Sequence, residues 1–268
     1  MTNPSYGKRF ASRRVAENYL YRPPYSAEVY STLLSLIGPE PRKVLDAGCG
    51  SGKIALGLVD HVERVDAVDP SIEMLNVAKR LCGGGNPKIP QNIRWINARM
   101  EEAPLDPPYA LIVAALSIHW MDLDRVLSRF AEALADRACL AVLDGDAPVD
   151  APWERDETAL MVRFLERIDG QRLSWWKSVG QRLGQPLLVH PAFQPIGHKV
   201  TKPVQFSQSV TDYLRCQHSR ATWSEDHLGE KASREFDAEM TKLLTRYAVD
   251  GMLTFAVQTR VEWGRVRI

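Results

Sequence analysis

Apolar and polar positions alternate along the middle of the chain in a pattern that predicts strands followed by helices. Short apolar runs predict strands at 43–47, 64–68, about 92–97, 109–116 and 138–143. Segments with helical spacing follow three of these runs, at 53–62, 72–82 and about 122–135. In the first of them Ile54, Leu58 and Val62 share one face, as expected for a helix packed on a sheet. Such alternation is typical of an α/β fold with a parallel sheet covered by helices on both faces.

The alternating core, which we place at 41–146, follows a different segment. Residues 1–40 predict an N-terminal helical cap. Within it, the two prolines of Tyr21–Tyr25 force an extended break, because each proline fixes its own backbone and restricts the residue before it. A helix is expected from about Ser26.

The pattern changes again after the core. Residues 147–197 combine charge, tryptophan and helical spacing, and they predict a helical lid inserted over the sheet. Residues 198–268 predict closing strands and helices that complete the core and a substrate pocket. Strand-like patterning at about 198–207 and 252–265, with helical segments between, fits an antiparallel closing pair at one sheet edge.

The most informative stretch is Val44 to Lys53, V-L-D-A-G-C-G-S-G-K, which predicts a strand, a tight turn and a helix. Glycine suits such a loop because it adopts backbone angles that a Cβ forbids and lets a ligand approach the backbone. The G-x-G-x-G spacing differs from the G-x-G-x-x-G of dinucleotide sites, and no Ser or Thr follows Lys53 as a triphosphate loop requires. A nucleotide-cofactor loop is the favoured interpretation, and a glycine-rich turn without a ligand is the alternative.

Composition narrows the possible partners. The 268 residues carry a net charge of +1, which argues against affinity based mainly on nucleic-acid phosphates. The longest apolar runs, such as Tyr109–Ile118, reach about half of the roughly 20 residues that cross a bilayer. Met1–Phe10 has no apolar signal region, so we expect a cytoplasmic protein. We also expect no membrane or nucleic-acid partners, and a monomer or homodimer. The four cysteines and six histidines lack paired ligand spacing, and we expect reduced thiols and no metal.

In an open α/β sheet, ligands bind beyond the carboxyl ends of the strands. The residues at those ends are Asp46 to Gly52, Asp69, 99–101 and 116–120. Asp69 follows the glycines by about 20 residues, where a carboxylate accepts hydrogen bonds from ribose hydroxyls. Its alternative role is that of an acidic residue favoured at a helix N-terminus.

Several motifs together resemble one known family. They are V-L-D-A-G-C-G-S-G at 44–52, V-D-P-S at 68–71, E-E-A-P-L at 101–105, L-S-I-H-W at 116–120 and Y-R-P-P-Y at 21–25. In this order they resemble the class I S-adenosylmethionine (SAM)-dependent methyltransferases of the trans-aconitate and malonyl-thioester (biotin pathway) type. The resemblance implies a Rossmann-like, seven-stranded, mostly parallel sheet with an antiparallel edge strand, helices on both faces and a helical lid. It also implies SAM as cofactor and S-adenosylhomocysteine as product.

The resemblance further implies a set of cofactor contacts. Asp46 and Gly48 would orient the methionine ammonium, and Asp69 the ribose. Arg99 stands where relatives commonly carry an acidic residue for the adenine amino group, so that contact would pass to the backbone. Tyr21 or Arg22 would close over the cofactor carboxylate, although an ordinary surface salt bridge is equally expected for Arg22. The full predicted set is Tyr21, Arg22, Asp46, Gly48, Cys49, Gly50, Asp69, Pro70, Met74, Arg99, Met100, Glu101, Leu116 and Ser117.

Methyl transfer from a sulfonium is an in-line displacement that depends mainly on alignment. His119 is the candidate base for acceptors that must lose a proton, and a structural histidine is the alternative. The predicted acceptor-pocket residues are Trp120, Trp176, Tyr213, Gln217 and His218. Aromatic residues at helical spacing are more often core, and that alternative stays open for the tryptophans.

The predicted function is therefore SAM-dependent methylation, at O, N or C, of a small metabolite or natural-product intermediate. An RNA or protein methyltransferase and a SAM-binding partner subunit without activity are the alternatives. A nicotinamide-dependent oxidoreductase is disfavoured by the glycine spacing.

Overall fold

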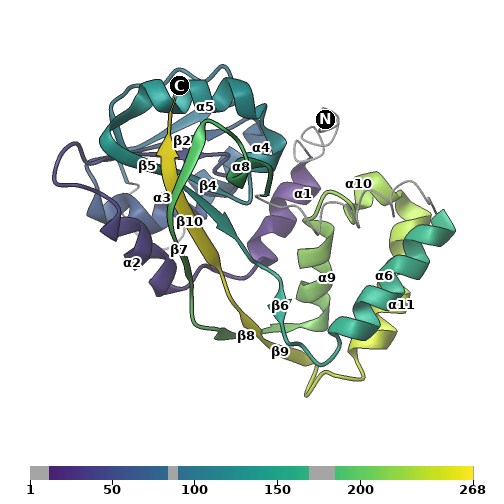
Figure 1. Ribbon diagram of the computed structural model, residues 1–268. Helices are drawn as coiled ribbons and strands as arrows, with labels where there is room; N and C mark the ends of the chain where they lie inside the picture. The colour runs from purple at the N-terminus through teal and green to yellow at the C-terminus, as the bar shows by residue number, and fades with distance from the viewer. Residues whose placement is uncertain (1–11, 84–89, 169–184, 268) are drawn as a thin grey trace.

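The computed structural model describes residues 12–83, 90–168 and 185–267. Its main feature is a seven-stranded sheet with strand order β3-β2-β1-β4-β5-β10-β7 (Figure 1). Its strands are β1 (Lys43–Ala47), β2 (Arg64–Asp69), β3 (Ile93–Asn97), β4 (Tyr109–Ala115), β5 (Leu134–Asp144), β7 (Phe193–Val200) and β10 (Arg260–Val266). Strands β1 to β5 are parallel, and β10 runs antiparallel to both β5 and β7 at one side of the sheet. The predicted Rossmann-like architecture is confirmed.

Helices cover both faces of this sheet because successive strand residues point to opposite faces. Val44 joins the core cluster under α2 (Ala27–Ser35) and α3 (Lys53–Leu58). Its neighbour Leu45 joins the opposite cluster, under α5 (Leu123–Ala133) and α8 (Gln185–Leu188). α4 (Ile72–Gly83) extends the first of these layers through Leu75. α3 is shorter than predicted, since the chain tightens into the 3₁₀ turn η3 (Val59–His61) after Leu58.

A second body stands beside the sheet (Figure 1). Its helices are α6 (Glu154–Ile168), α9 (Val210–His218), α10 (Glu225–Leu228) and α11 (Glu230–Leu244), and its small antiparallel sheet is β6 (Pro148–Val149), β9 (Met252–Val257) and β8 (Val204–Ser209). We call residues 148–168 and 204–257 the lid body. Its core is aromatic, and Trp223 stacks on Phe236 with ring centroids 4.8 Å apart.

The two strand-like runs of the C-terminal part each divide into two strands, which corrects the single strands expected there. The first run becomes β7 and β8, and the second becomes β9 and β10. The breaks face each other, because the Thr201 N–H donates to the Thr259 carbonyl (2.9 Å) and Lys202-Pro203 follows. Only β7 and β10 therefore complete the large sheet, while β8 and β9 belong to the lid body.

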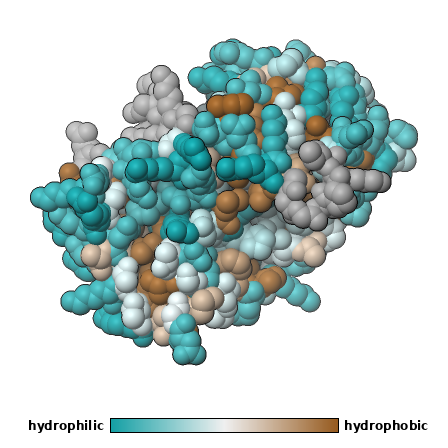
Figure 2. All heavy atoms as spheres, turned by 180° about the vertical axis from the view of Figure 1, so that it is seen from behind, coloured by the Kyte–Doolittle hydropathy of each residue, from teal (hydrophilic) through white to brown (hydrophobic). Residues whose placement is uncertain are grey.

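The cap segment, residues 12–25, lies between these two bodies. It contains α1 (Arg13–Asn18) and the 3₁₀ turn η2 (Tyr19–Tyr21), and α1 packs against α4 of the core and α9 of the lid body (Figure 1). The face seen in Figure 2 is mostly hydrophilic, with apolar atoms in separate patches. Within the described ranges, no helix is both long and apolar enough to span a bilayer. The division at residues 40, 146 and 197 remains a prediction.

Candidate cofactor and acceptor site

The glycine loop joins β1 to α3 at the carboxyl end of the sheet. Gly48 and Gly52 have φ angles of +73° and +79°, a region that side chains rarely adopt. A Cβ on Gly48 would lie 2.5 Å from the Ser117 Cβ, and one on Gly52 would lie 2.7 Å from the Trp95 ring. Glycine is therefore required here both by backbone angle and by close packing.

Asp69, the last residue of β2, fastens this loop to the neighbouring strand. One carboxylate oxygen accepts from the Gly50 N–H (2.9 Å), and the other accepts from the Ser71 N–H (2.8 Å) at the start of α4. Burial raises its pKa to about 6, although these two bonds oppose the shift. Each oxygen keeps a second lone pair, so the geometry is compatible with both the ribose role and the helix-terminal role.

Asp46 is completely buried near the end of β1 and is only half satisfied. Its Oδ2 accepts from the Ala55 N–H (3.1 Å), whereas Oδ1 has no hydrogen-bond partner in the described part of the chain. Burial raises the pKa of this carboxyl to about 7, and the charge of Asp69 adds to the shift. A buried carboxylate oxygen without a partner is costly, and an ammonium group would satisfy it. The residues present thus fit the methionine end of SAM.

The 99–101 segment lies at the end of β3. Met100 is buried, and the Glu101 carboxylate accepts from the Asp122 N–H (3.0 Å). Burial alone would raise the pKa of Glu101, but this bond and the Arg99 guanidinium lower it overall. The Arg99 side chain is 57% exposed and pairs with Glu101 at 3.4 Å. Its guanidinium therefore lies at the rim of this region.

At the end of β4, Leu116 adopts a left-handed backbone with a φ of +53°. A bulky residue rarely does so, and such strain concentrates at functional sites. Ser117 donates its hydroxyl to the Ala47 carbonyl (2.6 Å) and packs against Gly48. Ser117 therefore connects β4 to the glycine loop.

His119 and Trp120 follow in the 3₁₀ turn η4 (Ile118–Trp120), with ring centroids 4.7 Å apart. Burial, helped by the positive charge of Arg22, lowers the pKa of His119 to about 4. The imidazole is consequently neutral at physiological pH and able to accept a proton.

The cap segment crosses the glycine loop and is held from both sides. The Arg22 guanidinium stacks on the Tyr19 ring (4.0 Å), and Tyr19 lies 3.6 Å from the position of a Cβ on Gly50. From the core, the Lys53 ammonium donates to the carbonyls of Arg22 (2.7 Å) and Pro23 (2.9 Å). Burial lowers the pKa of Lys53 to about 8, with the nearby Arg22 charge contributing.

On the lid side, Arg22 forms a buried ion pair rather than the surface salt bridge considered as an alternative. Its Nη1 donates to Asp146 Oδ2 (3.1 Å), its Nε to the Ser219 hydroxyl (2.7 Å) and its Nη2 to the Ser219 carbonyl (3.1 Å). Arg220 donates to the other oxygen of Asp146 (3.0 Å). Burial by itself would raise the pKa of Asp146, but the charges of Arg220 and Arg22 hold it at about 2. Sequence reasoning missed Asp146, although its position just after β5 was the available signal.

The polar residues predicted for the acceptor pocket lie inside the lid body. The Tyr213 hydroxyl and the Gln217 amide both donate to the buried Glu157 carboxylate, at 2.8 and 3.1 Å. His218 contacts the Trp223 carbonyl (2.6 Å) and Asp237 (2.7 Å) through its two ring nitrogens. All three are engaged with the lid core. Trp176 lies outside the described residues.

The remaining predicted contacts are scattered. Met74 is buried against Val15 of the cap, Pro70 is exposed, and Cys49 is buried in the loop. The Tyr21 hydroxyl accepts from Arg215 (2.5 Å). In the described part of the chain, no three His, Cys, Asp or Glu side chains are grouped to hold a metal ion.

The sheet order and the glycine loop closed by Asp69 together define a Rossmann-like nucleotide-cofactor domain. Comparison with known proteins then identifies the type of domain: residues 44–137 match the family described as "Methyltransferase domain". An uncharacterised methyltransferase of Mycobacterium tuberculosis is 29% identical over 188 residues, covering 69% of this chain and 61% of that protein. The malonyl-[acyl-carrier protein] O-methyltransferase of Anoxybacillus flavithermus is 24% identical over 262 residues, covering 92% and 91% of the two chains.

A solved structure from Anaeromyxobacter dehalogenans, provisionally assigned as a type II methyltransferase, shares the fold. Its TM-score is 0.61 at 23% identity, with 91% of this chain and 97% of that one covered. The chain spans between 39% and 61% of the length of the yeast and mycobacterial curated relatives that it matches. The predicted resemblance to SAM-dependent methyltransferases is confirmed: residues 44–137 match a methyltransferase domain, the curated relatives are methyltransferases, and the solved structure shares the fold.

Proposed function

We propose that the protein transfers a methyl group from SAM to a small-molecule acceptor. The observation that carries the proposal is the Asp46 oxygen that has no partner among the described residues, buried beside a loop that only glycine can form. A positively charged ligand group at that point would satisfy the carboxylate, and the cofactor of this domain class carries one in its methionine part. The family match covers residues 44–137 alone, so the activity of the whole protein is part of this proposal.

Each part of the site has a distinct task in this proposal. Asp46 and the Gly48 backbone hold the ammonium end, Asp69 the ribose, and the backbone near Met100 the adenine. The cofactor supplies an activated methyl group when bound, so the protein has little covalent chemistry to perform. The cap segment covers the loop and excludes water, which favours displacement at the methyl carbon.

His119 is the proposed proton acceptor for acceptors that carry an ionisable hydrogen. Its imidazole is neutral because burial lowers its pKa to about 4, and a base of this kind serves only acceptors that are already acidic or polarised. A carboxylate acceptor would need no base. Trp120, adjacent to this ring, is the proposed pocket wall.

For the acceptor, we propose a metabolite or natural-product intermediate encountered in the cytoplasm. The name of the Anoxybacillus relative, which aligns over nearly the whole chain, supports including malonyl thioesters among the compounds to test. Net charge of +1 gives no support for nucleic acid as the acceptor.

The test begins with ligand-dependent melting of the purified protein. SAM and S-adenosylhomocysteine should raise the melting temperature, because a ligand at 100 times its Kd stabilises the folded state by about 2.7 kcal/mol. NADH should leave it unchanged. Methyl-labelled SAM is then offered with a panel of carboxylic acids, phenols, amines and malonyl thioesters. Absence of any shift with both SAM and S-adenosylhomocysteine would overturn the cofactor assignment, and binding without transfer to any acceptor would favour a non-catalytic partner subunit.

A further inference from the structure

Asp146 lies where the chain leaves the main sheet for the lid body. It sits between the end of β5 at Asp144 and the start of β6 at Pro148, along the connection that joins the two bodies (Figure 1). Its side chain is 10% exposed, and its two oxygens receive guanidinium groups from two different segments. The carboxylate thus joins three parts of the molecule that are far apart in sequence.

The first partner, Arg22, belongs to the cap segment. Its side chain is 9% exposed, and its guanidinium contacts Asp146, Ser219 and the Tyr19 ring. Tyr19 in turn lies over Gly50 of the glycine loop. A displacement of Arg22 would therefore move an aromatic ring that covers the cofactor loop.

The second partner, Arg220, follows α9 in the lid body. It stands next to Ser219, which accepts from Arg22 through both its hydroxyl and its carbonyl. The Ser219 hydroxyl donates to the Cys216 carbonyl (2.6 Å), so Ser219 is itself anchored in α9. The lid body thus places a hydrogen-bond acceptor, Ser219, next to a cation, Arg220.

Charge makes the carboxylate the necessary member of this group. Arg22 and Arg220 carry two positive charges in a largely buried place, and Lys53 adds a third nearby. Without Asp146 the two guanidiniums would lose the carboxylate that they share, and like charges at close range in a low dielectric repel. The other polar contacts of the cap with the lid body, such as Arg14 with Glu225 (3.0 Å), are exposed and contribute little.

We propose that Asp146 is a positioning residue that holds the cap segment and the lid body together over the cofactor loop. This inference rests on the proposed SAM-binding function, because one of its tests measures the affinity for the cofactor product. Asp146 itself contacts neither cofactor nor acceptor in this proposal. It acts through Arg22 and Arg220.

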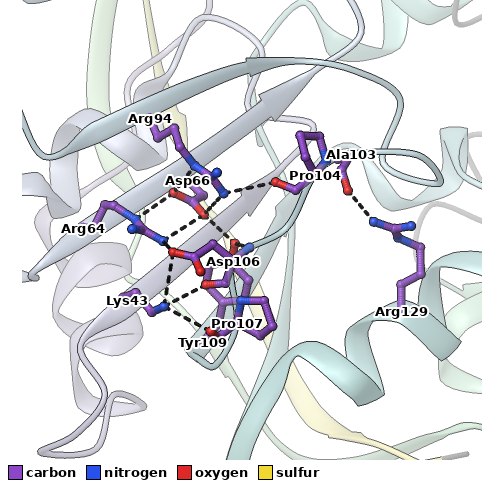
Figure 3. Close-up of polar contacts among 10 residues, drawn as sticks. All are labelled: Lys43, Arg64, Asp66, Arg94, Ala103, Pro104, Asp106, Pro107, Tyr109 and Arg129. Atoms are coloured by element: carbon purple, nitrogen blue, oxygen red, sulfur yellow. Dashed lines mark hydrogen bonds and ion pairs between the residues drawn. The ribbon is translucent and has the colours of Figure 1, made fainter.

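The chain offers a matched control in Asp66, which is also buried and also bound by two arginines. Its partners Arg64 and Arg94 both lie in the core, near the amino ends of β2 and β3 (Figure 3). Replacing Asp66 by Asn removes a comparable buried charge pair without touching the cap or the lid body. A purely structural role predicts that the two replacements behave alike.

The experiment measures S-adenosylhomocysteine affinity by calorimetry and hydrogen exchange by mass spectrometry on the full chain. D146N should weaken binding about tenfold and speed amide exchange in residues 12–25 and 210–220. D66N should keep the Kd within twofold and leave exchange in those segments unchanged. D146E, which restores the charge, should recover part of the affinity, and S219A should weaken binding about threefold while folding normally.

The outcomes separate the inference from the proposed function. If wild type fails to bind S-adenosylhomocysteine, the proposed function fails, while exchange in the cap and lid still tests Asp146. Unchanged affinity and unchanged exchange in D146N overturn the inference, as does an equal loss of affinity in D66N. If D146N does not fold, S219A decides, and wild-type affinity and exchange in that variant contradict the proposed coupling.

Discussion

Asp66 and Asp46 are buried carboxylates one register step apart on adjacent strands of the main sheet, yet their surroundings differ. Asp66, whose partners stand near the amino ends of the strands, receives hydrogen bonds from Arg94 (2.6 Å) and from the Tyr109 hydroxyl (2.5 Å) and pairs with Arg64 (3.0 Å) (Figure 3). At the carboxyl end, Asp46 is equally buried but has a single bond and one oxygen without a partner in the described residues. The adjacent strands β1 and β2 carry these two residues. Full satisfaction is the mark of a carboxylate that stabilises the fold, and an unmet acceptor marks one kept for a ligand.

The largest effect is expected for the replacement of Asp66, and it should appear in stability and not in ligand binding. Asp66→Asn removes the charge that Arg64, Arg94 and Tyr109 share, and it should lower the free energy of unfolding by about 3 kcal/mol. The cost is limited because Arg64 also pairs with the exposed Asp106. Urea denaturation followed by fluorescence measures it, with Arg234→Ala, an exposed pair with Glu230, as the control that changes little. A loss below about 0.5 kcal/mol would remove the contrast between the two carboxylates.

Asp46→Asn should give the reverse pattern, with ligand binding weakened and stability not lowered. Without the carboxylate, the affinity for S-adenosylhomocysteine should fall at least tenfold, or about 1.4 kcal/mol. Calorimetry at pH 8 measures it, where the wild-type carboxyl is ionised. An affinity within twofold of wild type would contradict the ligand role of Asp46.

The same variant has a predicted pH dependence. Burial raises the folded pKa of Asp46 to about 7 from its ordinary value of 3.8, so the folded state holds the proton more tightly than the unfolded state. This group's contribution therefore falls as pH rises from about 4 to 7, and its cost is fully present above pH 7. The stability of D46N relative to wild type should increase across that range and then level off. A difference that stays flat from pH 4 to 8 would show that Asp46 does not titrate as proposed.

The lid body provides a third case, in which the buried His218 carries charge through a half-exposed carboxylate partner. Both partners of His218, the Trp223 carbonyl and the Asp237 carboxylate, accept hydrogen bonds, so both ring nitrogens must carry protons. Burial opposes this charge, but the Asp237 bond raises the pKa of His218 overall. Its stabilisation is complete below the unfolded pKa of about 6.5 and is lost as pH rises through the folded pKa. His218→Gln should cost about 1 kcal/mol at pH 6 and less at pH 9 by urea denaturation, and an equal cost at both would rule out the imidazolium.

Sequence reasoning reached the carboxyl end of the sheet because its signals are local. The glycine spacing, Asp69 at the end of β2 and the strand–helix alternation each depend on residues close along the chain, and the strand-end rule brings them together. Asp66 gave no such signal, since an acidic residue inside an apolar run shows nothing of the arginines that will surround it. The loop was therefore predictable to within a residue or two, while the matching network at the other end was not.

The cap and lid contacts escaped prediction for a related reason. Arg22 meets Asp146 and Ser219 across 124 and 197 residues of sequence, and periodicity carries no information at that separation. Tyr213 and Gln217 were predicted as acceptor contacts from their polarity on a helix, yet Glu157 of α6 binds both. Which buried polar groups pair with one another depends on helix packing, and that is decided by tertiary structure rather than by the pattern of a single helix.

The smallest effect is expected for Arg99, at the rim of the carboxyl end. Its side chain is 57% exposed and its bond to Glu101 is long, whereas Glu101 is buried and has a second partner in the Asp122 N–H. Arg99→Ala should therefore change S-adenosylhomocysteine affinity by less than twofold and stability by less than about 0.5 kcal/mol. Glu101→Gln is the matched comparison, because it removes a buried charge from the same pair and should lower stability more. A tenfold loss of affinity in Arg99→Ala would mean that the arginine itself contacts the cofactor, and the adenine contact would then not be carried by backbone alone.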